Sequence, residues 1–274
     1  MSFLFDAKRA VTSVLRRILT PYLDNRVYTV RHGIAAGLKR RGGVGFIRRP
    51  LSKEETFVQQ LELRNLVAYD IGAYQGEYTL FLARAVGPNG QVVAFEPNPR
   101  SYQRIVENVA LNGFENVRTL NSAVGAHSGE ATLTFRQSEY AMGSLDKDLA
   151  AEMTARSDAQ DARVRIEPLD GLIEQERLPG PDFLKIDVEG FEFDVLTGMS
   201  ETLARHRPAL LIEMHGAGME RKAENARQVV DFVLSRGYCV FHVESDREID
   251  RENASVAREG HIWCRASEDV PASP

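Results

Sequence analysis

The sequence is poor in cysteine and lacks long apolar runs. Only two of its 274 residues are cysteines, Cys239 and Cys264, and they form no C-x-x-C pair. A disulfide framework and a structural zinc site are therefore poorly supported, and a reducing, cytoplasmic environment is expected. No stretch approaches the roughly 18 consecutive apolar residues of a membrane-spanning helix, and residues 1–20 alternate basic with apolar residues instead of forming a signal-peptide core.

The chain also has no excess of positive charge. Its 34 Lys and Arg residues against 39 Asp and Glu residues give a formal net charge of −5. Because neither an aromatic platform nor a continuous basic groove is apparent, nucleic acid is not expected as a partner. The charge is uneven, however. Residues 1–50 contain 11 basic and two acidic residues, a balance of +9, so residues 51–274 carry −14.

Residues 1–50 are predicted to form a basic helical N-terminal arm in front of a single domain over residues 51–274. Between Leu4 and Ile18, apolar residues recur at helical spacing with basic and polar residues opposite them. This apolar stripe is interpreted as packing on the acidic domain or on a second subunit of a homo-oligomer. Contact with an anionic membrane surface is the alternative. The glycine-rich stretch from Arg41 to Gly45 is interpreted as a flexible linker.

From Leu66 onward, short apolar runs alternate with helical patterns, which predicts an α/β fold with a mostly parallel sheet covered by helices on both faces. The last two strands have no helical pattern between them and are expected to pair antiparallel near one edge, with both cysteines buried. The expected strands are Val67–Ile71, Val92–Phe95, Val117–Leu120, Phe183–Ile186, Leu210–Met214, Cys239–Val243 and His261–Arg265. The expected helices are Tyr78–Ala85, Tyr102–Asn112, Phe191–Leu203 and Lys222–Arg236.

A long insertion, residues 125–180, separates the third strand from the fourth. Ala131–Phe135 and Ala162–Ile166 alternate apolar and polar residues and are predicted to be exposed strands, whereas residues 139–161 are polar and poorly patterned. Long irregular segments inside compact domains commonly act as lids. We therefore interpret this insertion as a lid on the substrate side.

The most informative stretch runs from Val67 to Gly76: a strand, the carboxylate of Asp70, a glycine loop and then a helix. The next strand ends in Glu96, whose carboxylate can accept hydrogen bonds from a ribose diol, so a nucleotide-like ligand is expected in this crevice. The glycines follow G-x-x-x-G spacing, so the pyrophosphate fingerprint G-x-G-x-x-G is incomplete. Asp70 would repel a pyrophosphate but tolerate a cationic sulfonium, which favours S-adenosylmethionine over a dinucleotide.

Several motifs in order then resemble the FkbM family of S-adenosylmethionine-dependent methyltransferases, over about residues 66–237. The resemblance implies a Rossmann-like class I methyltransferase fold with a seven-stranded sheet and one antiparallel strand, and usually O-methylation of a hydroxyl on a secondary metabolite or a glycan. Family members commonly have Asn at the position of Tyr74. The motifs are Asp70-Ile-Gly-Ala-Tyr-Gln-Gly-Glu-Tyr-Thr79, Phe95-Glu-Pro-Asn-Pro99, Asn121-Ser-Ala-Val124, Leu184-Lys-Ile-Asp-Val-Glu-Gly190 and Leu211-Ile-Glu213.

The resemblance implies three groups of cofactor contacts. The loop after the first strand surrounds the methionine part of the cofactor, the end of the second strand binds the ribose, and the end of the third faces the adenine. The implied cofactor-binding residues are Asp70, Gly72, Ala73, Tyr74, Gly76 and Thr79 in the loop, Glu96 and Pro97 at the ribose, Asn121, Ser122 and Ala123 at the adenine, and Asp187.

Methyl transfer to a hydroxyl requires alignment of the acceptor oxygen and benefits from a general base or a metal. The fourth strand ends in Asp187-Val-Glu189 and the fifth in Glu213-Met-His215, so four acid or base groups are expected to converge. Asp187 is ranked first and His215 second as the base, with Glu189 and Glu213 orienting the site or binding substrate hydroxyls. If a metal such as Mg²⁺ is present, Asp187, Glu213 and His215 are its expected ligands.

The sequence therefore predicts a cytoplasmic O-methyltransferase that acts on a small-molecule or glycan acceptor. Two alternatives stay open at this point. One is a nicotinamide-dependent oxidoreductase, which would be stabilised by NAD and not by S-adenosylhomocysteine. The other is a non-catalytic ligand-binding protein of the same fold, although the two strand-end clusters speak against it.

Overall fold

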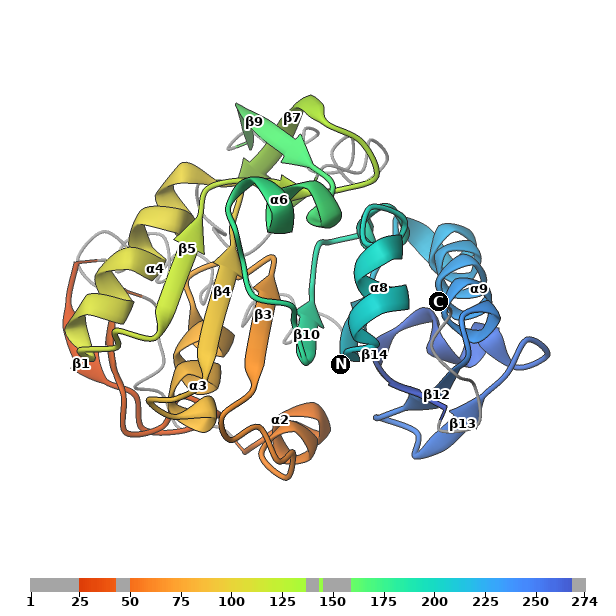
Figure 1. Ribbon diagram of the computed structural model, residues 1–274, viewed down its shortest axis with the longest axis horizontal. Helices are drawn as coiled ribbons and strands as arrows, with labels where there is room; N and C mark the ends of the chain where they lie inside the picture. The colour runs from red at the N-terminus through yellow and green to blue at the C-terminus, as the bar shows by residue number, and fades with distance from the viewer. Residues whose placement is uncertain (1–24, 43–49, 137–142, 145–158, 268–274) are drawn as a thin grey trace, which may run out of the picture.

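The computed structural model describes residues 25–42, 50–136, 143–144 and 159–267, and the predicted amphipathic helix lies outside them. Within the described residues, the centre of the molecule is an eight-stranded sheet with strand order β13-β12-β14-β11-β10-β3-β4-β5 (Figure 1). Its strands are β3 (Val67–Ile71), β4 (Gln91–Phe95), β5 (Val117–Leu120), β10 (Phe183–Ile186), β11 (Ala209–Met214), β12 (Tyr238–His242), β13 (Arg247–Ile249) and β14 (Gly260–Ala266).

The sheet is mostly parallel, as predicted, but the described part has one strand more than expected. The five strands from β5 to β11 in the sheet order are parallel to one another, whereas β14 inserts antiparallel between β11 and β12. The additional strand, β13, returns antiparallel along β12. The turn before it includes Asp246 in the left-handed region, φ 56°, which Asp tolerates. The prediction of seven strands with one antiparallel was therefore wrong in number, because the short, polar β13 gives almost no strand pattern.

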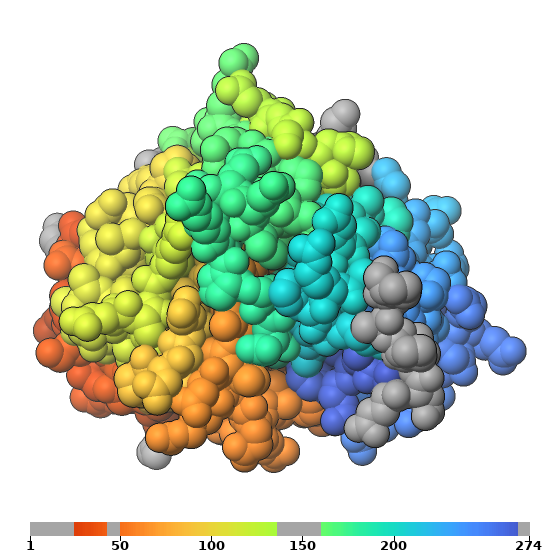
Figure 2. Space-filling model, in the orientation of Figure 1, coloured from red at the N-terminus to blue at the C-terminus, as the bar shows by residue number. Residues whose placement is uncertain are grey.

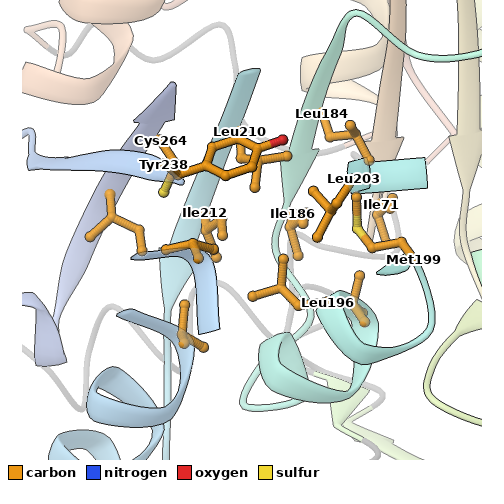
Figure 3. Packing of buried hydrophobic residues seen from close by; sticks show 14 of the residues in the cluster. Ile71, Leu184, Ile186, Leu196, Met199, Leu203, Leu210, Ile212, Tyr238 and Cys264 are labelled. Carbon is orange, nitrogen blue, oxygen red and sulfur yellow. The ribbon is translucent and has the colours of Figure 1, made fainter. Parts of the chain in front are cut away.

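Helices cover both faces of the sheet. One face packs against α2 (Lys53–Val58), α3 (Glu77–Val86) and α4 (Pro99–Leu111). The other packs against α6 (Leu169–Gln175), α7 (Glu192–Thr197), α8 (Ser200–His206) and α9 (Gly218–Ser235). Figure 3 shows Leu196, Met199 and Leu203 of this second layer against the apolar side chains of β3, β10 and β11. The close packing of both helical layers therefore holds the carboxyl ends of the parallel strands in fixed positions.

The helix predicted over residues 191–203 is two helices. The helix is interrupted at Gly198, between α7 and α8. A side chain there would lie 1.9 Å from the carbonyl oxygen of Gly125, so the close approach of two backbones sets the break.

The predicted burial of both cysteines was wrong for one of them. Cys264 of β14 is buried, but Cys239 is exposed because it occupies the outer face of β12.

The described part of the predicted arm, residues 25–42, is not helical. It forms an antiparallel hairpin of β1 (Val27–Thr29) and β2 (Lys39–Arg41), which packs on α4. Two asparagine side chains accept hydrogen bonds from the backbone of β2. Asn112, at the end of α4, accepts from the Lys39 N–H at 2.8 Å, and Asn108 of α4 accepts from the Arg41 N–H at 2.7 Å. These hydrogen bonds stabilise an extended backbone, because they satisfy N–H groups that would otherwise bond within a helix. The helical prediction was therefore wrong for these residues. The predicted oligomer or membrane contact of the arm stays a prediction.

The insertion forms a separate small sheet with order β6-β9-β7-β8. Its strands are β6 (Ala123–Val124), β7 (Gly129–Arg136), β8 (Gly143–Ser144) and β9 (Ala159–Glu167). The two predicted strands are confirmed, although one face is buried, with Leu133, Phe135 and Val164 in contact. This sheet projects at the top of the molecule (Figures 1 and 2). Most of residues 139–161 lie outside the described part, and the lid role stays a prediction.

A short 3₁₀ helix, η1 (Ala254–Arg258), connects β13 to β14. It packs against α9 through the buried Ala254 and Ala257. Among the described helices, none combines the length and the apolar composition needed to cross a membrane.

Candidate active site

The loop after β3 is held by a buried carboxylate. Asp70 is 2% exposed, and its Oδ2 accepts a hydrogen bond from the Thr79 hydroxyl of α3 at 2.6 Å. Burial raises the pKa of Asp70 to about 6, against the opposing effects of Thr79 and Lys185. Gly76 caps α3 in the left-handed region, φ 84°. Asp70 and Thr79 therefore fix the strand-to-helix turn, and neither lines the two cavities described below.

Besides Gly76, two more residues of this loop have left-handed backbone. Gly72 has φ 81°, and a Cβ at this position would lie 1.7 Å from the carbonyl oxygen of Asp187, so the loops after β3 and β10 touch through backbone. Tyr74 has φ 49°, an unusual value for a bulky residue. Asn adopts this conformation more readily, which gives a physical reason why Asn is common at this position in the family that the motifs resemble.

Glu96 is placed at the end of β4, where the resemblance predicts a ribose ligand. Its Oε2 accepts from the Tyr74 N–H at 2.7 Å, and its Oε1 accepts from the Asn98 N–H at 2.8 Å. Burial raises the pKa of Glu96 to about 8, although both hydrogen bonds lower it. Asn121 donates to the carbonyl oxygens of Glu96 and Pro97, at 2.7 and 3.0 Å. Asn121 thus supports the Glu96 loop through its side chain.

A cavity of about 210 Å³ lies at the carboxyl ends of β3, β4 and β10. Many of the predicted cofactor and catalytic residues line it, whereas Asp70, Ala73, Gly76, Thr79, Asn121 and His215 are not among its lining residues. The lining residues are Ile71, Gly72, Tyr74, Phe95, Glu96, Pro97, Asn98, Ser122, Ala123, Val124, Leu133, Asp187, Val188, Glu189, Phe191 and Glu213.

Two of the predicted catalytic acids converge on a buried lysine. Lys185 of β10 is 1% exposed, and its Nζ lies 3.1 Å from Asp187 Oδ2 and 3.6 Å from Glu213 Oε2. The ammonium also lies 4.9 Å from the centre of the Tyr78 ring. Burial alone would lower the pKa of Lys185, but the two carboxylates raise it above its ordinary value. Lys185 is therefore a fixed positive charge beneath the site.

His215 lies among carboxylates on every side described. Its Nδ1 is 3.2 Å from Glu192 Oε1, and its Nε2 is 3.5 Å from Glu213 Oε1 and 3.6 Å from Glu189 Oε2. Burial would lower the pKa of His215, but these partners raise it to about 11. An imidazole with this pKa is protonated at neutral pH and has no lone pair with which to accept a proton.

The carboxylates around His215 differ in their proton affinity. Burial raises the pKa of Glu189 to about 7 and also raises that of Asp187. For Glu213 burial acts in the same direction, but hydrogen bonds from His215 and His261 hold the pKa of its carboxyl well below the usual range. Perturbed pKa values of this kind, clustered in a cleft, are typical of functional sites.

Sequence reasoning missed four supporting residues. His261 of β14 lies opposite Glu213 in the strand pairing, with its Nε2 3.3 Å from Glu213 Oε2 and its Nδ1 2.7 Å from Glu244 Oε1. The fully buried Glu192 accepts from the Asn225 side chain at 2.7 Å as well as contacting His215. The predicted strand at His261 was a usable signal, but pairing it with β11 required knowing the register. Asn225 gave no signal, although α9 follows β11 directly and the Asn225 side chain also donates to the His215 carbonyl oxygen at 2.9 Å.

The predicted metal ligands are close together but do not fit Mg²⁺ well. Asp187, Glu213 and His215 each offer a ligand atom, and these atoms lie within 4.8 Å of one another. However, the Lys185 ammonium already contacts both carboxylates, and both His215 nitrogens face carboxylate oxygens. A divalent cation would bring like charge against Lys185. We therefore derive no step through a metal.

Metal removal tests this conclusion directly. We expect EDTA to leave the rate of the predicted methyl-transfer reaction within about twofold of the untreated rate, because Lys185 already supplies the positive charge at the two carboxylates. The measurement is the initial rate with and without EDTA, followed by addition of Mg²⁺ or Mn²⁺. Loss of activity that either ion restores would contradict the prediction.

The fold and the site together define a class I methyltransferase-like α/β protein. Residues 70–240 match the family model of the methyltransferase FkbM domain, and the chain belongs to this family. Its fold is similar to that of methyltransferase FkbM from Methylobacillus flagellatus KT, with a TM-score of 0.50 and 16% identity over 76% of this chain and 45% of that chain.

Two curated relatives are similar over about half of this chain. The hexuronic acid methyltransferase AglP of Haloferax volcanii is 29% identical over 157 residues, which cover 57% of this chain and 58% of the relative. Methyltransferase 1 of Beauveria bassiana is 30% identical over 146 residues, or 48% of this chain and 57% of the relative. The chain thus spans less than two thirds of these relatives.

Proposed function

We propose that this chain transfers a methyl group from S-adenosylmethionine to a hydroxyl oxygen of a small-molecule or glycan acceptor. The observation that carries the proposal is that Asp187, Glu189 and Glu213 line the same cavity as Glu96. This arrangement offers acid and base groups beside a pocket suited to a nucleoside. Membership in a methyltransferase family supports the reaction type.

The residues of the cavity suit the nucleoside part of the cofactor. Each Glu96 oxygen accepts one backbone N–H, and a carboxylate has about four acceptor sites, so capacity remains for a ribose diol. Ser122 and Ala123 line the same cavity at the adenine position. When bound, S-adenosylmethionine supplies an electrophilic methyl group on its sulfonium. The protein then has to align the acceptor oxygen with that methyl and exclude water.

We assign proton acceptance from the acceptor hydroxyl to Asp187. It lines the cavity, its pKa is raised by burial, and Lys185 can stabilise its charge at 3.1 Å. His215 is assigned an orienting role, because an imidazolium between Glu189, Glu192 and Glu213 holds those carboxylates in place. Glu189 and Glu213 are assigned to the acceptor hydroxyls.

A sugar-type acceptor has specific support from one relative. The Haloferax volcanii protein is named as a hexuronic acid methyltransferase, and its similarity covers 57% of this chain. Carboxylates exposed in a cavity are also suitable acceptors for the hydroxyl donors of a polyol. We therefore place a glycan or another polyhydroxylated molecule first among the acceptors.

Ligand binding and label transfer together test the proposed function. S-adenosylhomocysteine should raise the melting temperature of the protein and NAD should not, because a ligand of the native state stabilises it. Transfer of labelled methyl from S-adenosylmethionine to a panel of sugars and polyols then tests the reaction. Stabilisation by NAD alone would overturn the proposal in favour of an oxidoreductase.

Cofactor affinity should depend on pH through Glu96. Its pKa is about 8 in the free protein, and ribose hydroxyls donate to the ionised form. Binding therefore favours loss of the proton, so the affinity for S-adenosylhomocysteine should increase as the pH rises toward about 8, by as much as about tenfold per pH unit. Isothermal titration calorimetry over this range measures the slope.

The variant Glu96→Gln isolates this contribution from those of Asp70 and Glu189, which titrate at about 6 and about 7. We expect weaker binding, by about tenfold or more at pH 8, and a flatter pH dependence, since Gln cannot ionise. An unchanged pH slope in the variant would show that Glu96 is not responsible.

A further inference from the structure

A second cavity adjoins the first on the side of α2 and α3. It has a volume of about 300 Å³ and shares Gly72, Tyr74 and Asp187 with the first cavity. Part of its wall comes from residues that precede the family domain. Its other lining residues are Ile34, Ser52, Glu54, Glu55, Ala73, Glu77, Tyr78 and Lys185.

The first cavity alone is small for the cofactor. Its volume of about 210 Å³ lies below the roughly 300–1,000 Å³ of pockets that hold drug-sized ligands. S-adenosylmethionine consists of a nucleoside joined through sulfur to an amino-acid end, so it can occupy two connected compartments. Glu96 and Ser122 mark the first cavity as the nucleoside compartment. The second cavity is then in position for the amino-acid end.

The acids that line the second cavity differ in their partners. Both Glu55 oxygens accept backbone N–H groups, from Ser52 at 2.9 Å and Ile34 at 3.4 Å. Glu77 pairs with Arg40 at 2.9 Å. Glu54, only 8% exposed, instead accepts from the neutral hydroxyl of Ser52 at 2.5 Å. Its carboxylate therefore retains acceptor capacity for a cationic donor, and an α-ammonium group supplies three N–H donors.

We propose that α2 completes the cofactor site and that Glu54 binds the α-ammonium group of S-adenosylmethionine in the second cavity. The proposal rests on the proposed function. It gives the segment before residue 70 a binding role that the family domain, residues 70–240, does not contain. It also gives a role to a buried acid whose pKa burial raises even though Ser52, His261 and Lys185 lower it.

The test compares two ligands that differ in the amino-acid end. S-adenosylhomocysteine has this end, whereas 5′-methylthioadenosine has a methyl group on the sulfur in its place. In Glu54→Gln we expect the affinity for S-adenosylhomocysteine to fall about tenfold, through loss of a charge-assisted hydrogen bond, and that for 5′-methylthioadenosine to stay within about twofold. Burial raises the pKa of Glu54, so calorimetry is done at about pH 8, well above the ordinary range of a glutamate, to favour the ionised carboxylate.

The matched control is Glu62→Gln, which removes an exposed carboxylate just beyond α2 and should change neither affinity. Unchanged S-adenosylhomocysteine affinity in Glu54→Gln would overturn the proposal. So would an equal loss for both ligands, because it would indicate damage to the nucleoside compartment. If the wild type binds neither ligand, the proposed function is wrong and this proposal is wrong with it. If the wild type binds both ligands and only the Glu54→Gln result differs from the expectation, this proposal alone is wrong.

Discussion

The variant Asp187→Asn should lose methyl transfer by about 10²–10³-fold at saturating cofactor, because it removes the proposed proton acceptor while keeping the shape of the side chain. The Lys185 ammonium would still contact Glu213, so the buried charge keeps a partner. The measurement is kcat with labelled S-adenosylmethionine and the acceptor found in the panel. The change in S-adenosylhomocysteine affinity should be much smaller than the loss of turnover.

A surface carboxylate provides the control for this variant. Asp231 of α9 is exposed and pairs with Arg251 at 2.5 Å, away from both cavities. Asp231→Asn should leave kcat within about twofold. Turnover by Asp187→Asn at the rate of this control would exclude Asp187 as the proton acceptor and would direct attention to Glu189, whose pKa is about 7.

The variant Gly72→Ala should be strongly destabilised, by at least about 3 kcal/mol of unfolding free energy. The added Cβ would lie 1.7 Å from the carbonyl oxygen of Asp187, and the residue has a left-handed φ of 81°. Relief requires the loops after β3 and β10 to separate, which would also move Asp187 away from Gly72. Urea denaturation followed by circular dichroism measures the loss, and binding of S-adenosylhomocysteine should fall with it.

Gly113→Ala separates the effect of contact from that of backbone conformation. Gly113 also has a left-handed φ, 66°, but a Cβ there would meet nothing within 4 Å. Only the conformational cost remains, so the expected loss is about 1–2 kcal/mol. Equal losses in the two variants would mean that the approach of the two loops contributes little to stability.

The parallel part of the fold was predictable because its strands carry strong local signals. The expected bounds of β3, β5 and β10 agree with the structure, since each is a short apolar run between a turn and a helix. What failed depends on contacts that are distant in sequence. The hairpin of residues 25–42 pairs with asparagine side chains of α4, and the break at Gly198 follows from the approach of Gly125.

The candidate site divides in the same way. Asp187 and Glu189 follow β10 and Glu213 lies near the carboxyl end of β11, so their convergence could be inferred from the predicted parallel strands. The protonation state of His215 could not be inferred, because its proton affinity depends on Glu192, and no sequence pattern places Glu192 at 3.2 Å from the imidazole. Likewise the roles proposed for Glu54 and observed for His261 come from segments outside the family motifs.

The position of β14 has a consequence for where this domain can end. The family match stops at residue 240, inside β12, yet β14 comes later in the chain and is hydrogen-bonded between β11 and β12. A polypeptide cut at the family boundary would leave two apolar strands with open backbone edges in the middle of the sheet, a template for aggregation. Evolutionary similarity and cooperative folding therefore have different boundaries in this chain. The autonomous unit includes at least β14, and with it His261 beside the proposed catalytic acids.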